Sequence, residues 1–151
     1  MKAKSFSLLD QTGKKMALKD FAGSHLVLYF YPKNFTSGCT KEAEAFRDAA
    51  KAIESLGASV VGISKDTVES HAKFATKHGL AFVLLSDPDL AVTKRYEAFG
   101  TKNMYGKVVE GVKRSTFLIG PDGTLLREWR NVRVAGHVEA VLEALRQVKA
   151  S

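Results

Sequence analysis

The stretch "HLVLYFYPKNFTSGCTKEAEAFRD", residues 25–48, joins an apolar run to a polar loop and then to an amphipathic segment. Its first seven residues are continuously aliphatic or aromatic, which is typical of a central strand covered on both faces. From Lys41 onward the apolar residues recur every three or four positions, which predicts one helix that ends at Gly57. These residues are Ala43, Phe46, Ala50, Ile53 and Leu56.

The alternation of strands and helices continues along the chain. Further strands are predicted at 58–63, 80–87, 115–119 and 124–129, and further helices at 66–79, 89–99 and about 137–148. Two short apolar pieces, 5–9 and 16–21, flank a turn and predict an N-terminal hairpin. The pattern predicts an α/β, thioredoxin-like fold, with a central mixed sheet flanked by helices, as a single domain over 1–151. The segment 100–113 is expected to be an irregular recognition loop.

The composition narrows the class of protein. The chain has 151 residues, of which 45% are hydrophobic, and 23 basic against 16 acidic residues give a net charge of +7. The densest basic stretch, "REWRNVR" at 127–133, holds only three arginines. The basic charge is therefore spread over a solvated surface, which argues against nucleic-acid binding and favours acidic partners.

The hydrophobic segments and the single cysteine together predict where in the cell the protein works. The N-terminal residues lack the apolar stretch of a secretory signal, and charged residues interrupt every hydrophobic segment before it could span a bilayer. Cys39 is the only cysteine, so no internal disulfide can form. A lone thiol suits a reducing compartment, and we expect a cytoplasmic protein without membrane contact, metal or cofactor.

Cys39 lies just after the central strand, where ligand sites of open α/β sheets are found. Its neighbours Ser37, Gly38, Thr40 and Lys41 are small or polar, so we expect the thiol in a turn and not on an apolar face. If the helix begins at Thr36 or Ser37, unpaired N–H groups and the helix dipole favour the thiolate. These features predict a reactive nucleophile.

The segment "YPKNFTSGCTKE" resembles the active-site signature of the peroxiredoxins, Pro-x-x-x-Thr/Ser-x-x-Cys, with Pro32, Thr36 and Cys39 at the fixed positions. Other segments match, in order over nearly the whole chain, the bacterioferritin-comigratory-protein or Q-type branch. They are "GISKD", "HAKFATKHGL", "LLSDPD" and "KRSTFLIGPDG". The resemblance implies a thiol peroxidase that reduces hydrogen peroxide and organic hydroperoxides through a sulfenic acid on Cys39.

The resemblance also implies roles for the neighbouring residues. Thr36 would bond the entering hydroperoxide, since a hydroxyl both donates and accepts. Arg114 would stabilise the thiolate and the leaving oxygen with its cationic fork, and Pro32 would shield the sulfur from water. Glu42 either orients Arg114 or is an ordinary exposed helix carboxylate, and the residues leave both interpretations open.

The sequence departs from the family pattern after the first chemical step. Many Q-type members carry a resolving cysteine five residues after the first, where this chain has Glu44, and others carry it on the next helix, where 66–79 has none. We therefore expect a one-cysteine peroxidase that is regenerated by thioredoxin, or by glutaredoxin or glutathione, and that is a monomer or a weak homodimer.

Two other functions compete with the peroxidase. One is a cysteine hydrolase with Cys39 as nucleophile and His137 as base, although the known cysteine-hydrolase signatures are absent. The other is a basic nucleic-acid-binding or chaperone-like module with an incidental thiol. His71 and His78 are expected at the surface, because two histidines alone make a poor metal site, and Trp129 is expected to pack partly covered.

Overall fold

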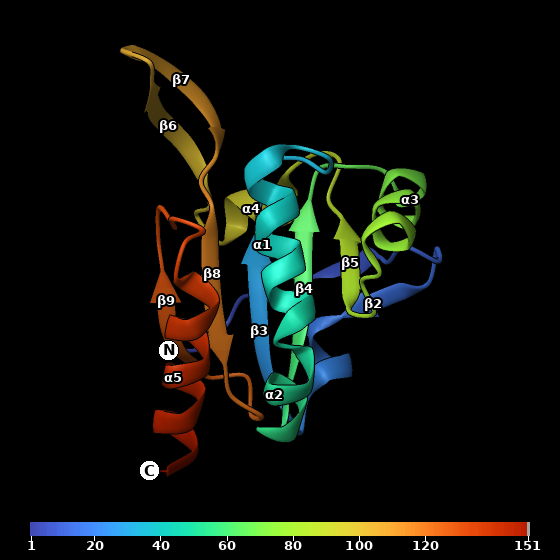
Figure 1. Cartoon of the computed structure of the whole chain (residues 1–151), viewed down its shortest axis with the longest axis vertical. Helices are drawn as coiled ribbons and strands as arrows, with labels where there is room; N and C mark the ends of the chain where they lie inside the picture. The colour runs from blue at the N-terminus through green and yellow to red at the C-terminus, as the bar shows by residue number, and fades with distance from the viewer. Residues whose placement is uncertain (151) are drawn as a thin grey trace.

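The computed structural model describes residues 1–150, which contain a seven-stranded sheet in the order β2-β1-β5-β4-β3-β8-β9 and a separate two-stranded ribbon, β6-β7 (Figure 1). The strands of the large sheet are β1 Ser7–Leu9, β2 Lys15–Ala17, β3 His25–Phe30, β4 Ala58–Ser64, β5 Val83–Ser86, β8 Ser115–Ile119 and β9 Leu125–Trp129. The helices are η1 Leu18–Phe21, α1 Ser37–Asp48, α2 Ala50–Ser55, α3 Val68–His78, α4 Ala91–Arg95 and α5 His137–Ala150.

The sheet is mixed, as the alternation of elements predicts. Strands β3, β4 and β5 are parallel, whereas β8 is antiparallel to β3 and β9 to β8. Tyr29 of β3 pairs with Gly62 of β4, and a Cβ at Gly62 would stand 2.9 Å from the tyrosine ring. Glycine at position 62 therefore lets the aromatic ring lie flat across the neighbouring strand.

Two apolar layers cover the two faces of the sheet. On one face α1 and α2 pack over β3 and β4, and α5 packs over β8 and β9, with Phe46, Ile53 and Leu145 fully buried (Figure 1). On the other face η1, α4 and the N-terminal strands enclose Leu28, Phe30 and Phe117. Among the described helices none is long and apolar enough to cross a membrane.

The predicted single helix over 41–57 is wrong in its continuity, because the structure has two helices there. The backbone of Ala49 leaves helical geometry with ψ at 0°, and Asp48, a weak helix former, accepts a hydrogen bond from Arg47 at 2.9 Å. Phe46 and Ile53 nevertheless face the same core. The apolar periodicity thus predicts the buried face correctly and does not detect a break of one residue.

The predicted irregular loop over 100–113 is also wrong. Phe99–Met104 (β6) and Lys107–Val112 (β7) form an antiparallel ribbon that projects beyond the sheet (Figure 1). The turn uses Tyr105 and Gly106, both with positive φ, which suits a two-residue hairpin turn. Neither strand alternates apolar and polar residues, since most of the ribbon is exposed on both faces. For that reason the periodicity gives no strand signal here.

The N-terminal hairpin is confirmed, with β1 and β2 antiparallel. Its second strand is shorter than predicted, because residues 18–21 form the 3-10 helix η1 instead of extending the strand. The carboxylate of Asp20 accepts a hydrogen bond from the Ala17 N–H at 2.7 Å, which closes this turn. The remaining predicted strands and helices occur with ends shifted by a few residues.

Candidate active site

Cys39 lies in the first turn of α1, directly beyond the end of β3. The helix begins at Ser37 with Thr36 as its N-cap, so the Cys39 amide belongs to the unpaired N–H groups of the first turn. The side chain is only 2% exposed and packs in the same cluster as Tyr29 and Tyr31. The expectation that the thiol avoids an apolar surround is therefore wrong, because aromatic side chains from β3 cover this polar turn.

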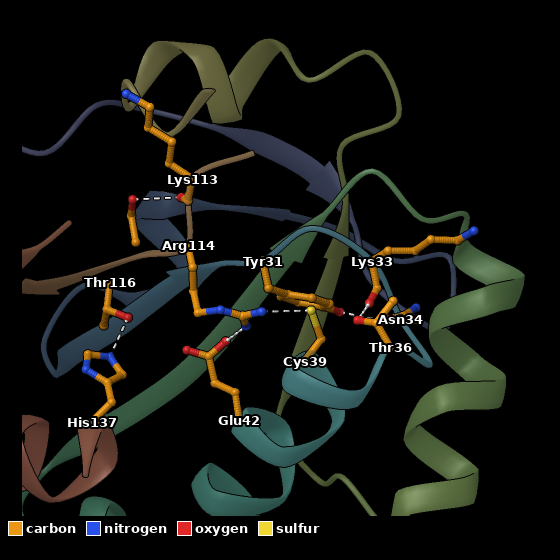
Figure 2. Close-up of polar contacts among 11 residues, drawn as sticks. Tyr31, Lys33, Asn34, Thr36, Cys39, Glu42, Lys113, Arg114, Thr116 and His137 are labelled. Carbon is orange, nitrogen blue, oxygen red and sulfur yellow. Dashed lines mark hydrogen bonds and ion pairs between the residues drawn. The ribbon is translucent and has the colours of Figure 1, made fainter. Parts of the chain in front are cut away.

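Arg114 reaches Cys39 because of the sheet topology. Ser115 of β8 pairs with Phe30 of β3, which places Arg114 level with the end of β3 although it is 75 residues from Cys39 in sequence. Its Nη2 donates to the Cys39 sulfur at 3.3 Å, as Figure 2 shows. The contact places a cation against the sulfur, where it can stabilise charge that moves between the sulfur and a reacting oxygen.

Glu42, one helical turn after Cys39, is fully buried, so the interpretation as an exposed carboxylate is wrong. Its Oε1 accepts a hydrogen bond from Arg114 Nη1 at 2.6 Å, so one guanidinium contacts both the carboxylate and the sulfur (Figure 2). Burial raises the pKa of Glu42 to about 7, and the charge of Arg114 opposes that rise. Within the described chain, Glu42 Oε2 has no hydrogen-bond partner.

Thr36 and Pro32 lie in the loop between β3 and α1. The Thr36 side chain is exposed, and its hydroxyl donates to the Lys33 carbonyl at 2.8 Å. That bond fixes the direction of the hydroxyl and leaves its lone pairs able to accept from a molecule entering from solvent. Pro32 is half-buried. The structure thus brings the predicted residues into one region, with Thr36 on its solvent side.

His137, the base of the hydrolase alternative, is engaged elsewhere. Its Nε2 shares a hydrogen bond of 2.8 Å with Thr116 Oγ1, and its ring packs edge-on against Phe46 and Trp129 (Figure 2). Burial, together with the charge of Arg114, lowers the pKa of His137 to about 4. A histidine held in this way is a weak base at neutral pH. Trp129 itself is half-buried, as predicted.

The prediction that His71 is a surface residue is wrong. Its side chain is fully buried under the active-site loop, because it lies one turn before Phe74 on the inner face of α3. The prediction for His78 is also inaccurate, since its side chain is only 14% exposed and its Nδ1 lies 3.4 Å from Glu44 Oε2. Glu44, at the position of a resolving cysteine in many relatives, therefore links α1 to α3.

A buried polar cluster beneath the loop escaped the sequence analysis altogether. Asn34 hydrogen-bonds Tyr31, His71 and Ser70 through its side chain and Asp66 through its main chain. Asparagine and histidine are common on surfaces, and 37 residues separate these two, so no local pattern pairs them. The adjacent Phe35 has a left-handed backbone, with φ at 66°. A non-glycine residue in that region is uncommon and tends to mark functional loops.

Comparison with known proteins agrees with this geometry. Residues 1–127 match the model of the AhpC/TSA family. Peroxiredoxin Bcp of Xanthomonas campestris is 46% identical over 134 residues, covering 89% of this chain and 84% of the relative. Peroxiredoxin Bcp of Bacillus subtilis is 41% identical over 147 residues, covering 97% of this chain and 94% of the relative.

Solved structures share the whole fold. The bacterioferritin comigratory protein of X. campestris superposes with a TM-score of 0.90 at 43% identity, over 95% of this chain and 92% of that one. BcpB of Mycobacterium tuberculosis gives a TM-score of 0.86 at 37% identity, over 98% and 96%. Fold, sequence and a cysteine held by an arginine all agree, and the chain belongs to the Bcp/PrxQ peroxiredoxins of the AhpC/TSA family, which makes it a thiol peroxidase.

Proposed function

We propose that this peroxidase reduces hydrogen peroxide and organic hydroperoxides by a one-cysteine mechanism at Cys39. The observation that carries the proposal is the contact of 3.3 Å between Arg114 Nη2 and the sulfur, in a chain with one cysteine. Organic substrates are supported by the X. campestris relative, whose alkyl peroxide reduction activity has been studied on trapped intermediate and ligand complexes.

In the first step the Cys39 thiolate attacks the terminal oxygen of ROOH. A sulfur–oxygen bond forms as the oxygen–oxygen bond breaks, and the leaving RO⁻ takes a proton from solvent to become ROH. Cys39 is oxidised to the sulfenic acid, which keeps the hydrogen of the peroxide. Arg114 stabilises charge that moves from sulfur to oxygen, Thr36 accepts a hydrogen bond from the hydroperoxide, and Pro32 excludes water from the thiolate.

Glu42 orients Arg114 in this scheme. Its Oε1 holds one end of the guanidinium at 2.6 Å, which aims the other end at the sulfur. A charge-assisted hydrogen bond of this kind reduces the rotational freedom of a long side chain before the substrate arrives. Glu42 therefore acts through Arg114 and does not touch the peroxide.

An outside thiol completes the cycle, since the chain has no second cysteine. A thiolate R′S⁻ attacks the sulfenic sulfur and releases hydroxide, which gives a mixed disulfide, and a second thiol then frees Cys39 and leaves R′SSR′. Thioredoxin, or glutaredoxin with glutathione, supplies such thiols. The net charge of +7 favours an acidic reductant.

We further propose that the chain acts as one domain, as a monomer or weak homodimer, in the cytoplasm, where reducing conditions keep the thiol free. We propose no metal or cofactor for this chemistry, because the thiolate and the outside thiols supply the electrons and solvent supplies the proton.

Intact mass spectrometry tests the mechanism. One equivalent of peroxide should add one oxygen to the protein, in a form that dimedone traps, and excess peroxide should add two or three. Cys39→Ser is the matched control and should gain nothing. If disulfide-linked dimers are the main product, Cys39 of a second subunit resolves the sulfenic acid, and the outside-thiol step must be abandoned.

Stopped-flow oxidation by hydrogen peroxide and by cumene hydroperoxide then ranks the substrates. Turnover with thioredoxin, with glutaredoxin plus glutathione, and with glutathione alone identifies the reductant. A parent protein whose Cys39 reacts with peroxide no faster than free cysteine would contradict the proposed catalytic role of its neighbours.

A further inference from the structure

The side chain of Asn34 connects the loop that carries Pro32 and Thr36 to α3. The Asn34 amide donates to Ser70 Oγ at 3.1 Å and faces His71 Nδ1 at 3.0 Å, while its Oδ1 accepts from Tyr31 at 2.6 Å. The Asn34 main-chain N–H donates to Asp66 at 2.9 Å. Every polar group of the Asn34 side chain is therefore paired inside the protein.

The protonation of His71 follows from its two closest polar neighbours, since the Tyr31 and Ser64 hydroxyls lie farther from the ring, each at 3.5 Å. Its Nε2 lies 3.0 Å from the Leu85 carbonyl, which can only accept, so Nε2 carries the hydrogen. Nδ1 of the neutral ring is then left as the acceptor for the Asn34 amide. Burial lowers the pKa of His71, which keeps the ring neutral, although the nearby Asp66 opposes that shift. His71 thus bridges β5 and the active-site loop.

A second contact holds the same loop against the same helix. Phe35, whose backbone is left-handed, packs edge-on against Phe74 with ring centroids 5.1 Å apart. Asn34 and Phe35 immediately precede Thr36, which is the last residue before the helix that carries Cys39. Lengthening or loss of the hydrogen bond between Asn34 and His71 would therefore move the Thr36 hydroxyl relative to the Cys39 sulfur.

We propose that His71 is a positioning residue for peroxide reduction, because its Nδ1 fixes Asn34 and thereby the loop that presents Thr36 to the substrate. His71 has no contact with the peroxide or the thiolate in this role. The inference rests on the proposed function, since it concerns the rate of the same first step at Cys39.

Two substitutions separate the two hydrogen bonds of His71. His71→Asn places an amide oxygen near the position of Nδ1, so it keeps the acceptor for Asn34 and loses the donor to Leu85. His71→Gln places its amide near the position of Nε2, so it keeps the donor and loses the acceptor. We expect His71→Gln to slow oxidation of Cys39 by hydrogen peroxide roughly ten-fold, in line with one lost hydrogen bond. His71→Asn should react within about three-fold of the parent, because its remaining loss lies outside the loop.

Asn34→Ala removes the same bond from the loop side, which keeps the test decisive if a His71 variant does not fold. It should slow the reaction by a similar factor, and adding His71→Gln to it should cost little more, because residues that act through one bond are not additive. Ile119→Ala, at the opposite end of the sheet, is the stability control and should lower the unfolding midpoint without slowing peroxide reduction.

Equal rates for His71→Gln and the parent would overturn the inference, as would equal losses in His71→Gln and His71→Asn, which indicate a purely structural role. These results would leave the proposed function intact. A parent protein that fails to form a sulfenic acid would overturn both the proposed function and this inference.

Discussion

Two buried polar pairs lie side by side at β8 and differ in how they are held. Arg114 binds Glu42 of α1, and Thr116, two residues later, binds His137 of α5. Burial pushes both titrating partners toward their neutral forms, raising the pKa of Glu42 to about 7 and lowering that of His137 to about 4. Only Glu42 has a charged partner, and only its pair contacts the thiol.

The comparison distinguishes the pair that we propose takes part in the chemistry from a pair that only packs. In the Arg114 pair the Glu42 carboxyl is buried beside a cation, and its Oε2 lacks a partner among the described residues. In the Thr116 pair a neutral ring is enclosed by aromatic side chains. Buried charges cost free energy, and this cost supports the proposal that the Arg114 pair takes part in the reaction.

The largest expected effect comes from Arg114. Arg114→Ala should slow oxidation of Cys39 by ~10²-fold or more, because the preorganised donor to the sulfur and the leaving oxygen is lost. The protein should still fold, since Glu42 can then take up a proton. Stopped-flow kinetics with hydrogen peroxide measures the change. The double variant Arg114→Ala/Glu42→Gln, which removes the buried carboxylate as well, should be equally slow, and a parental rate in either variant would show that Arg114 is wrongly assigned.

The next largest effect is expected from Thr36, and Thr116 of the other pair provides the comparison. Thr36→Val removes the hydroxyl that faces the substrate and should slow the reaction by ~10²-fold, whereas Thr36→Ser keeps it and should stay close to the parent. Thr116→Val makes the same change in the packing pair and should leave the rate unchanged. All three are compared by pseudo-first-order oxidation at one pH. A slow Thr116→Val variant would mean that the Thr116–His137 pair also takes part in the reaction, so the two pairs would no longer differ in role.

Glu42 should make the protein less stable as pH rises. Its folded pKa of about 7 lies above the ordinary value of 4.5, so the folded state holds the extra proton between these values. Its contribution is fully present below pH 4.5 and is lost as pH rises through 7, on the order of 2 kcal/mol between pH 5 and 7. Urea unfolding at several pH values should show this slope in the parent and not in Glu42→Gln. Identical slopes would mean that Glu42 ionises at an ordinary pH.

The contribution of His137 to stability should change with pH in the opposite direction to that of Glu42, and it is measured over a narrower pH range. Its folded pKa of about 4 lies below the ordinary 6.5, so its contribution is present above pH 6.5 and is lost as pH falls toward 4. The expected loss between pH 6.5 and 5 is on the order of 1 to 2 kcal/mol. His137→Gln should remove this slope in the same urea series and should leave the rate of Cys39 oxidation at the parental value. A His137→Gln variant that keeps the slope would assign it to another group.

The sequence alone determined what depends on local periodicity and on residue chemistry. The apolar run of β3, the polar turn with Cys39 and the helical spacing after it predict a nucleophile at the end of a central strand, and the structure has Cys39 at that place, in the first turn of α1. Pro32, Thr36 and Cys39 were identified through the family signature and Arg114 through the wider resemblance, and the structure places Arg114 against Cys39 and Thr36 in the preceding loop. The single cysteine restricts the chemistry of regeneration whatever the fold.

Only the tertiary structure decided what depends on contacts between distant segments. Pairing of β8 with β3 brings Arg114 to Cys39, and the packing of α3 buries His71 against Asn34, neither of which any local pattern encodes. The environment of Glu42 could not be predicted from the sequence. A glutamate one turn after the cysteine has the same local sequence pattern whether its carboxylate faces solvent or an arginine. Burial and partner charge set a pKa, and both are properties of the folded surroundings, not of the residue.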